Sequence, residues 1–279
     1  MYKRQGGRKI YDIVFQVSNH DIAFKYRVYS QDNILCCIVK KEATGFMLPE
    51  GSTTFLCPQA APMGGFARTS PSYETSYTVD DVTGKNGWGN GYTFPCLFKN
   101  EDKGWILISE TGVSSAYCGS RLLGKENGLY TIGFPQEGEY NGNGTVSPGI
   151  ALPGETPWRT ITVGKTLAPI VETTVMFDVV KPLYEASQDF QYGCGTWSWI
   201  IGGDNSMNYD EQKRYIDFSA DMGYSSVLVD ALWDTQVGRD KIAELADYAA
   251  SKGVALYLWY NSNGYWNDAP QSPRSIMNN

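Results

Sequence analysis

The pattern of apolar residues changes type once along the chain, and this change constrains the fold more than any other feature. From residue 10 to about residue 180, short apolar runs alternate with turns rich in Gly and Pro, which is typical of β-strands. After Lys181-Pro182, strand patterns alternate with helix patterns instead. We therefore predict a multi-domain chain with a β-sandwich domain at residues 1–182, a linker at 183–193 and an α/β domain at 194–279.

The first domain is predicted from its strands. Residues 22–28 alternate apolar and polar side chains, with the period of a half-buried strand. Strands at 92–99 and 105–109 flank the hairpin loop 100–104. Residues 170–177 are rich in β-branched residues and are predicted as a further strand. Many short strands without a clear helix predict a sandwich or a barrel.

The second domain is predicted as strand–helix–strand–helix–strand. The expected strands cover residues 196–201, 226–231 and 254–260, and each helix between them has one apolar face. Capping signals support the helices: Asn208 followed by Glu211 at the start of the first, and the terminal glycines Gly223 and Gly253.

Two folds begin with this pattern, a doubly wound dinucleotide-binding sheet and a (β/α)8 TIM barrel. The first would need G-x-G-x-x-G after its first strand, but Gly202-Gly203-Asp204 follows Ile201. The barrel is therefore favoured. Because a whole barrel takes about 250 residues, we expect only its first three βα units here, in a truncated chain.

Composition excludes some functions and partners. The net charge is −7, which argues against binding to nucleic acid. No run of about 18 apolar residues is present, so no membrane span is predicted. Six cysteines without a CxxC pair, together with a single histidine, His20, argue against a zinc site. We expect mostly buried free thiols and a solvated His20 in a polar turn.

Aromatic and polar residues gather where the strands of the second domain end. Trp197 and Trp199 lie in the first predicted strand, and Asp230 ends the second, shortly before Trp233. Asn261 follows Trp259-Tyr260 at the end of the third. In a barrel these ends form the active face. Rings that stack on sugar C–H groups, beside carboxylates and amides that bind hydroxyls, are typical of carbohydrate binding.

These motifs resemble the barrel opening of glycoside hydrolase family 97, in the runs Gly195-Thr-Trp-Ser-Trp199, Val227-Leu-Val-Asp230 and Leu258-Trp-Tyr-Asn261. Upstream, the chain resembles the N-terminal domain of that family in Gly91-Tyr-Thr-Phe-Pro95, Leu107-Ile-Ser-Glu110 and Thr156-Pro-Trp-Arg-Thr-Ile161. The resemblance runs from about residue 10 to the end of the sequence, and it rests on the order and spacing of the motifs.

The resemblance implies a bacterial α-glucosidase or α-galactosidase of periplasmic or extracellular location, acting on oligosaccharides with calcium in its active site. It implies an N-terminal β-super-sandwich, a (β/α)8 barrel, and catalytic carboxylates beyond Asn279. Glycoside hydrolysis needs two carboxyl groups across one bond. We therefore assign no catalytic residue and expect residues 1–279 alone to be inactive.

The resemblance also gives roles to individual residues. Glu110 is expected to be a calcium ligand, the alternative being a strand-end glutamate in solvent. Asp230 is expected to bind a sugar hydroxyl, or else to act as a cap or in a structural ion pair. Trp199 and Trp233 form a stacking platform or pack in the core, and Asn261 is a further substrate-binding candidate. We expect Arg159 at the domain interface; the weaker candidates are Glu74, Asp234, Asp240 and Asp268.

Two other functions remain open from the sequence. One is a non-catalytic carbohydrate-binding protein that uses the same aromatic residues. The other is a dinucleotide-dependent oxidoreductase, which the missing glycine fingerprint disfavours. The sequence does not distinguish glucosides from galactosides, retention from inversion, one cysteine pairing from another, or one oligomeric state from another.

Overall fold

The computed structural model describes residues 2–5, 8–58, 78–79, 91–126, 128–137, 145–189 and 192–260. These residues form two compact units, and along the chain the change from one to the other falls between Tyr184 and Glu185. This position is close to the predicted boundary at residue 182. No helix in the described ranges is long and apolar enough to cross a membrane.

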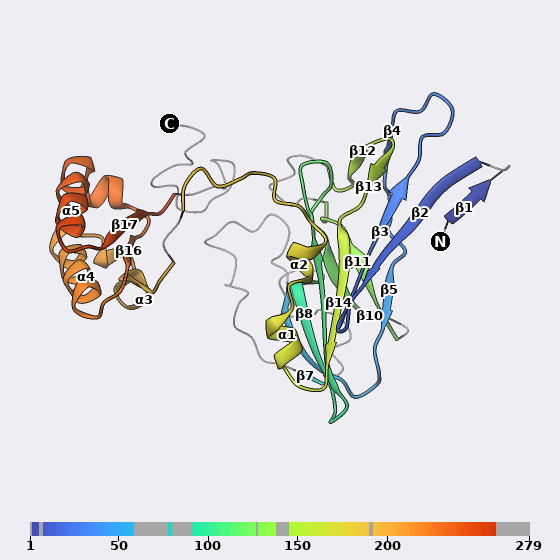
Figure 1. The fold of residues 1–279 in the computed structure, drawn as a ribbon, viewed down its shortest axis with the longest axis horizontal. Helices are drawn as coiled ribbons and strands as arrows, with labels where there is room; N and C mark the ends of the chain where they lie inside the picture. The colour runs from blue at the N-terminus through green and yellow to red at the C-terminus, as the bar shows by residue number, and fades with distance from the viewer. Residues whose placement is uncertain are drawn as a thin grey trace. The chain divides into compact units, whose positions relative to one another are not determined.

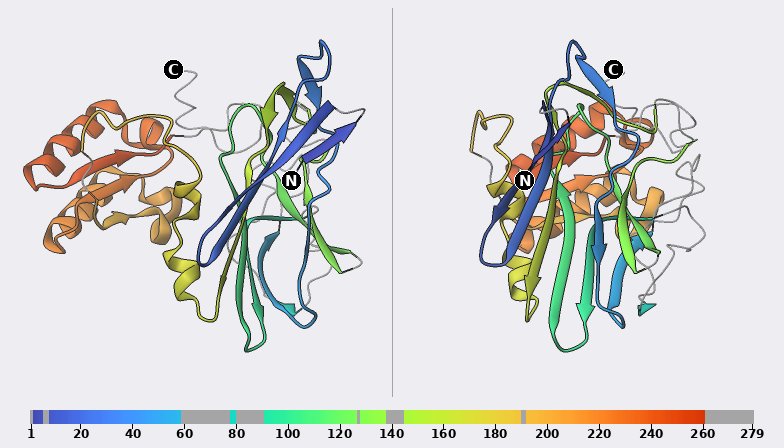
Figure 2. Two further views of the ribbon diagram at one scale, coloured as in Figure 1. Left: turned by 45° about the vertical axis from the view of Figure 1, so that its right-hand side comes forward. Right: turned by 90° about the vertical axis from the view of Figure 1, so that its right-hand side faces the viewer.

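The first unit is built on one large antiparallel sheet that curls into a half-barrel (Figures 1 and 2). Among the described residues, its main path runs β1-β2-β3-β14-β9-β8-β10-β11-β5, with β6, β7 and β13 attached at its sides. The bounds are β1 Tyr2–Gln5, β2 Arg8–Val17, β3 Asp21–Val28, β5 Gly45–Met47, β6 Thr53–Pro58, β7 Thr78–Val79, β8 Tyr92–Asn100, β9 Gly104–Thr111, β10 Arg121–Glu126, β11 Leu129–Gly133, β13 Gly154–Glu155 and β14 Trp158–Gly164.

The predicted β-rich domain and its hairpin are confirmed. The Asn100–Gly104 turn joins β8 to β9, and the Lys103 amide donates to the Asn100 carbonyl at 2.8 Å. The strands of the main sheet are joined by hydrogen bonds into one continuous sheet, in which β8 pairs with β9 and β10 as well as with β6. A small second sheet pairs β4, Cys36–Ile38, with β12, Gly149–Ala151.

The core of the first unit lies against this sheet. Its fully buried residues come from the central strands and include large aromatic and aliphatic side chains that pack into one cluster: Phe46, Leu56, Tyr92, Phe98, Ile108, Leu122, Tyr130 and Ile132. Phe98 and Tyr130 meet edge to face with ring centroids 5.2 Å apart. Burial of these rings is the main favourable term that offsets the entropy lost on ordering the sheet.

The predicted strand at 170–177 is wrong, because this segment forms two short helices, α1 Ala168–Glu172 and α2 Val175–Asp178. Pro169 lies in the first turn of α1, where its fixed φ favours a helix. Val175 is buried with Ala23 and Trp158. Tertiary packing therefore outweighs the β propensity of the β-branched residues.

The second unit contains a three-stranded parallel sheet in the order β15-β16-β17. Its elements are β15 Gly195–Trp197, α3 Trp199–Gly202, the 3-10 helix Gly203–Ser206, α4 Tyr209–Asp221, β16 Ser226–Val229, the π-helical turn Trp233–Val237, α5 Arg239–Ser251 and β17 Ala255–Leu258. The predicted order of elements is confirmed. The first strand is shorter than predicted, because buried Ser198 bonds to Ser206 Oγ at 2.9 Å and the chain turns into α3.

The predicted helix caps of the second unit are confirmed. Asn208 is extended and accepts a hydrogen bond from the Glu211 amide at 2.9 Å through its side-chain oxygen. Gly223 and Gly253 follow the two long helices with φ values of +70° and +74°, in the left-handed region that suits glycine. These local signals fix the start of α4 and the ends of both helices.

Both long helices cover the same face of the parallel sheet. Val227 and Val229 of β16 are buried in one cluster with Ile216 of α4 and Leu245 of α5. The opposite face carries Trp197 together with Leu228 and Tyr257, which lie in register across the three strands. Neither of the two long helices packs on that face, although parallel sheets usually have both faces covered; Trp199, the first residue of α3, stacks on Trp197 there.

Replacing the capping residue should destabilise the second unit. We expect Asn208→Ala to lower the free energy of unfolding by about 1 kcal/mol, because the Glu211 amide loses its side-chain acceptor. Urea unfolding followed by circular dichroism measures this change. The control Asn205→Ala removes an exposed amide from the preceding turn and should change stability less. Equal effects of the two variants would contradict the capping role.

Candidate functional site

Side chains suited to carbohydrate binding meet at the carboxyl edge of the parallel sheet. Trp197 is the last residue of β15, Asp230 follows β16 directly, and Trp259 and Tyr260 follow β17. Because parallel strands end at the same edge, residues separated by more than thirty positions along the chain are neighbours here. Asn261, predicted at this edge, lies outside the described residues.

Asp230 is a buried carboxylate held by two donors. Asp230 is only 5 % exposed. Oδ2 accepts a hydrogen bond from the Trp197 indole nitrogen, and Oδ1 accepts from the Ala231 amide at 2.5 Å. Burying a carboxylate is costly unless it is hydrogen-bonded, so these donors are what allows Asp230 to lie here. Leu232, two residues after Asp230, has the unusual φ of +72° for a non-glycine residue.

Trp197 and Trp199 form a stacked pair beside Asp230. Their ring centroids lie 5.7 Å apart and the planes differ by 18°. The Trp199 indole donates to Asp204 Oδ1 at 3.0 Å, while the Trp197 indole donates to Asp230. Each ring of the pair is therefore oriented by a different carboxylate.

Trp233 differs from this pair because it is buried. It is 2 % exposed within the core of the second unit, and its indole donates to the Trp259 carbonyl at 2.9 Å. Tyr260 meets its ring edge on, at 5.7 Å and 73°. These contacts favour a packing role over the predicted stacking platform. Asp240 lies in the first turn of α5 and Asp234 in the π-helical turn, whereas Glu74 and Asp268 are outside the described residues.

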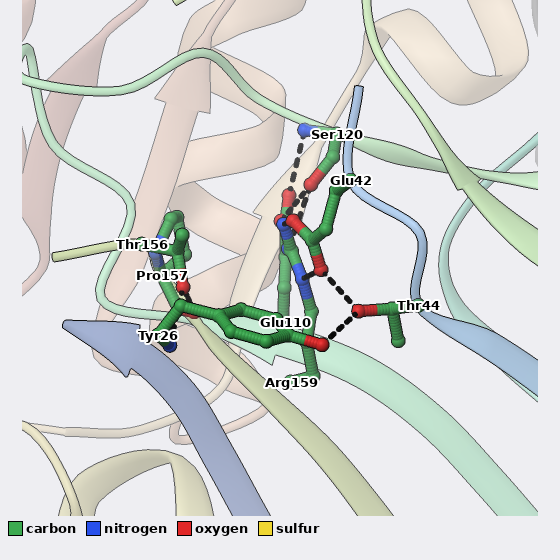
Figure 3. A network of polar contacts seen from close by, with 8 residues as sticks. All are labelled: Tyr26, Glu42, Thr44, Glu110, Ser120, Thr156, Pro157 and Arg159. Atoms are coloured by element: carbon green, nitrogen blue, oxygen red, sulfur yellow. Dashed lines mark hydrogen bonds and ion pairs between the residues drawn. The ribbon is translucent and has the colours of Figure 1, made fainter. Parts of the chain in front are cut away.

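The first unit contains a separate polar cluster around Arg159, which is fully buried (Figure 3). Its guanidinium donates to both carboxylate oxygens of Glu42, at 2.9 and 2.5 Å. It also pairs with Glu110, which lies directly opposite on β9, and donates to Ser120 Oγ at 2.7 Å. We predicted Arg159 at a domain interface; the partners found for it all belong to the first unit.

Hydrogen bonds extend this cluster to β3. Thr44 donates to Glu42 Oε1 at 2.8 Å and lies 3.0 Å from the Tyr26 hydroxyl (Figure 3). Burial would lower the pKa of Arg159, but hydrogen bonding and charge from Glu42 outweigh it, so this pKa is raised. Burial and the neighbouring Glu42 also raise the pKa of Tyr117. The guanidinium of Arg159 therefore stays charged.

The Glu110 carboxylate could provide one oxygen ligand to a calcium ion. Its Oε1 accepts from the Ser120 amide at 3.1 Å, and its Oε2 is taken by Ser120 Oγ and Arg159. A carboxylate has about four acceptor positions, so one position on Oε1 is left for a cation. The cluster has one more negative than positive charge. Since the described ranges hold no group of three or more Asp, Glu, His or Cys at metal-binding distance, Glu110 can supply only one ligand of several.

All six cysteines are free thiols. The expectation that most are buried is wrong, since only Cys96 is buried while Cys36 and Cys194 are exposed. Burial and the charge of Glu110 raise the pKa of the Cys118 thiol to about 11. His20 is exposed in the bend before β3, in agreement with its predicted place in a polar turn.

Models of known protein families match nearly the whole chain. Residues 2–182 match the model of the glycosyl-hydrolase 97 N-terminal domain, and residues 189–277 match the glycoside hydrolase 97 model. The chain belongs to glycoside hydrolase family 97. The family resemblance predicted from the sequence is therefore confirmed, and the observed β-rich first unit is the N-terminal domain of this family.

Individual relatives agree with this family. A crystal structure of a β-arabinopyranosidase is 53 % identical, with a TM-score of 0.87 over 99 % of this chain and 44 % of its own. A probable retaining α-galactosidase of Streptomyces bingchenggensis is 28 % identical over 92 % of this chain and 38 % of its own. A family 97 enzyme of Pseudoalteromonas sp. strain K8, solved with acarbose, is 23 % identical, with a TM-score of 0.66 over 94 % of this chain and 41 % of its own. The chain thus spans about two-fifths of the length of these relatives.

Some residues of this family 97 chain were not predicted as site residues. Glu42 lies between β4 and β5, where no periodic pattern signals burial, yet it is 6 % exposed and binds Arg159. Ser120 likewise gave no signal. Trp197 was visible as an aromatic residue at a strand end, but only the structure shows that it is the partner of Asp230.

The buried ion pairs of Arg159 predict a large effect of its removal. We expect Arg159→Met to lower the free energy of unfolding of the first unit by about 3–5 kcal/mol, because Glu42 and Glu110 would remain buried without their cation. Guanidinium denaturation measures the loss. The control Arg27→Met removes a half-exposed arginine paired with Glu155 and should cost less than about 1 kcal/mol. A similar cost for both variants would refute the proposed role of burial.

Proposed function

We propose that the intact protein is a retaining, exo-acting family 97 glycosidase that removes galacto-configured sugars from oligosaccharides. The observation that carries this proposal is the 53 % identity to a β-arabinopyranosidase over nearly the whole chain. β-L-arabinopyranose has the ring configuration of α-D-galactopyranose and lacks only its exocyclic CH2OH group. The α-galactosidase named among the relatives therefore points to the same ring stereochemistry.

The second unit would be the beginning of a (β/α)8 barrel. Its helices cover one face of the sheet, and the other face carries apolar residues such as Leu228 and Tyr257. A barrel gives such a face an interior to line. Glycoside hydrolysis needs two carboxyl groups on opposite sides of the scissile bond. We place both in later barrel strands, so residues 1–279 alone would be inactive.

Within this barrel, the substrate would bind at the carboxyl edge of the sheet. Trp199 and Asp230 lie at that edge, and Asn261 follows the strand that ends there. The burial of Trp233 supports a structural role for that residue. By resemblance to the family, we propose a periplasmic or extracellular location.

The substrate proposal predicts a ranking of activities. The intact enzyme should hydrolyse p-nitrophenyl β-L-arabinopyranoside and α-galactoside at least about a hundredfold faster than α-glucoside, because a site built around an axial O4 leaves polar groups unpaired with an equatorial one. Proton NMR of the first product should show retained anomeric configuration. Preference for the α-glucoside would refute the galacto proposal, and sugar binding without turnover would favour the non-catalytic binding protein.

We also propose that calcium assists this reaction and that Glu110 is one of its ligands. A bound calcium ion would supply charge stabilisation beside the sugar. Oxygen ligands of this ion are preferentially carboxylates, and Glu110 offers one remaining acceptor position. Arg159 and Ser120 fix the direction of that carboxylate.

Glu110→Gln should weaken calcium binding to the intact enzyme about tenfold or more, because a neutral amide oxygen is a poorer ligand for a dication. Isothermal titration calorimetry measures the affinity. Since Glu110 also pairs with Arg159, the variant should lose stability in chelator as well. Glu42→Gln is the matched control, because it weakens the same ion-pair cluster from the other side. Equal calcium affinity of the two variants would make Glu110 a structural residue only.

A further inference from the structure

The face of the parallel sheet opposite the two long helices carries aromatic residues, and one of them, Trp197, lies at the carboxyl edge. Trp197 lies in register with Leu228, which lies in register with Tyr257, so the three side chains project from the same side. Within residues 1–279, Trp197 is 38 % exposed. In the proposed barrel this face lines the interior, and its carboxyl edge opens to the active face. Trp197 is also the last residue of its strand, which places it at the edge where Asp230 lies.

The orientation of Trp197 is fixed from two directions. Its indole nitrogen donates to Asp230, and the second oxygen of that buried carboxylate is held by the Ala231 amide. Trp199 stacks on one side of the ring, and Trp197 still keeps part of its surface exposed. A ring held in this way loses little conformational freedom when a ligand packs against it.

We propose that Trp197 is the ring against which the sugar packs in the bound state, and that Asp230 is a positioning residue which sets the angle of that ring. This inference rests on the proposed glycosidase function and names the residue that recognises the sugar ring. Galacto-configured pyranosides suit such a surface, because the axial O4 leaves the C–H groups of C3, C4 and C5 together on one apolar face. Trp233 cannot take this role in the same way, since its ring is already enclosed.

A double-mutant cycle on the intact enzyme tests the coupling of the two residues. The measured quantities are kcat, KM and the inhibition constant of free galactose, which is an equilibrium affinity. Trp197→Ala and Asp230→Ala should each raise this constant about tenfold, with a smaller effect on kcat. The double variant should be no worse than Trp197→Ala alone within about twofold, because Asp230 acts through the ring. Asp230→Asn, which keeps an oxygen acceptor for the indole, should lose less affinity than Asp230→Ala.

The outcomes separate this inference from the function on which it rests. If the parent enzyme hydrolyses no glycoside, the proposed function fails. If it is active but the two alanine substitutions multiply in their effects, Asp230 contacts the sugar directly and the positioning role is wrong. If Trp197→Ala lowers the melting temperature while the inhibition constant is unchanged, Trp197 is barrel packing only. Asp210→Ala, which removes an exposed carboxylate from the first turn of α4, is the control and should leave the inhibition constant unchanged.

Discussion

The first unit is organised around a guanidinium that has been removed from water. Arg159 is completely buried, and such a charge is tolerated only when its donors are matched by nearby acceptors. Glu42 provides a two-point partner from the segment between β4 and β5, and Glu110 and Ser120 provide the rest from β9 and the connection to β10. One side chain thereby joins three segments that are far apart in sequence. The register between β14 and β9 places Arg159 directly opposite Glu110, as this ion pair requires.

The second unit also contains a buried charged side chain that needs hydrogen-bond partners. Asp230 is buried at a sheet edge and is satisfied by an indole and a backbone amide rather than by an arginine. A neutral donor leaves the negative charge uncancelled, unlike the pairing in the first unit. The two carboxylate environments therefore differ in kind: the first ties strands together, and the second combines negative charge with an aromatic surface.

The sequence was informative where local chemistry decides the structure. Asn208 with Glu211, the glycines at 223 and 253, and the Asn100–Gly104 hairpin were all predicted and are present. Prediction failed where distant packing decides. Residues 170–177 have strand composition but form helices because Val175 packs on Ala23 and Trp158. At the candidate site, the strand-end aromatic residues were recognisable, but the burial of Trp233 and the pairing of Trp197 with Asp230 depend on three-dimensional neighbours.

The backbone at Leu232 shows how the carboxyl edge of the parallel sheet obtains its shape. A leucine at a φ of +72° is in a conformation that costs about 1 kcal/mol or more relative to the ordinary regions, and glycine would adopt it freely. Leu232 is partly buried against the core of the second unit, so packing of its side chain offsets part of this backbone cost. This position has to satisfy two opposing demands, a sharp reversal of the chain and an apolar anchor. Few of the twenty amino acids meet both demands. We therefore expect few substitutions to be tolerated in the turn after Asp230.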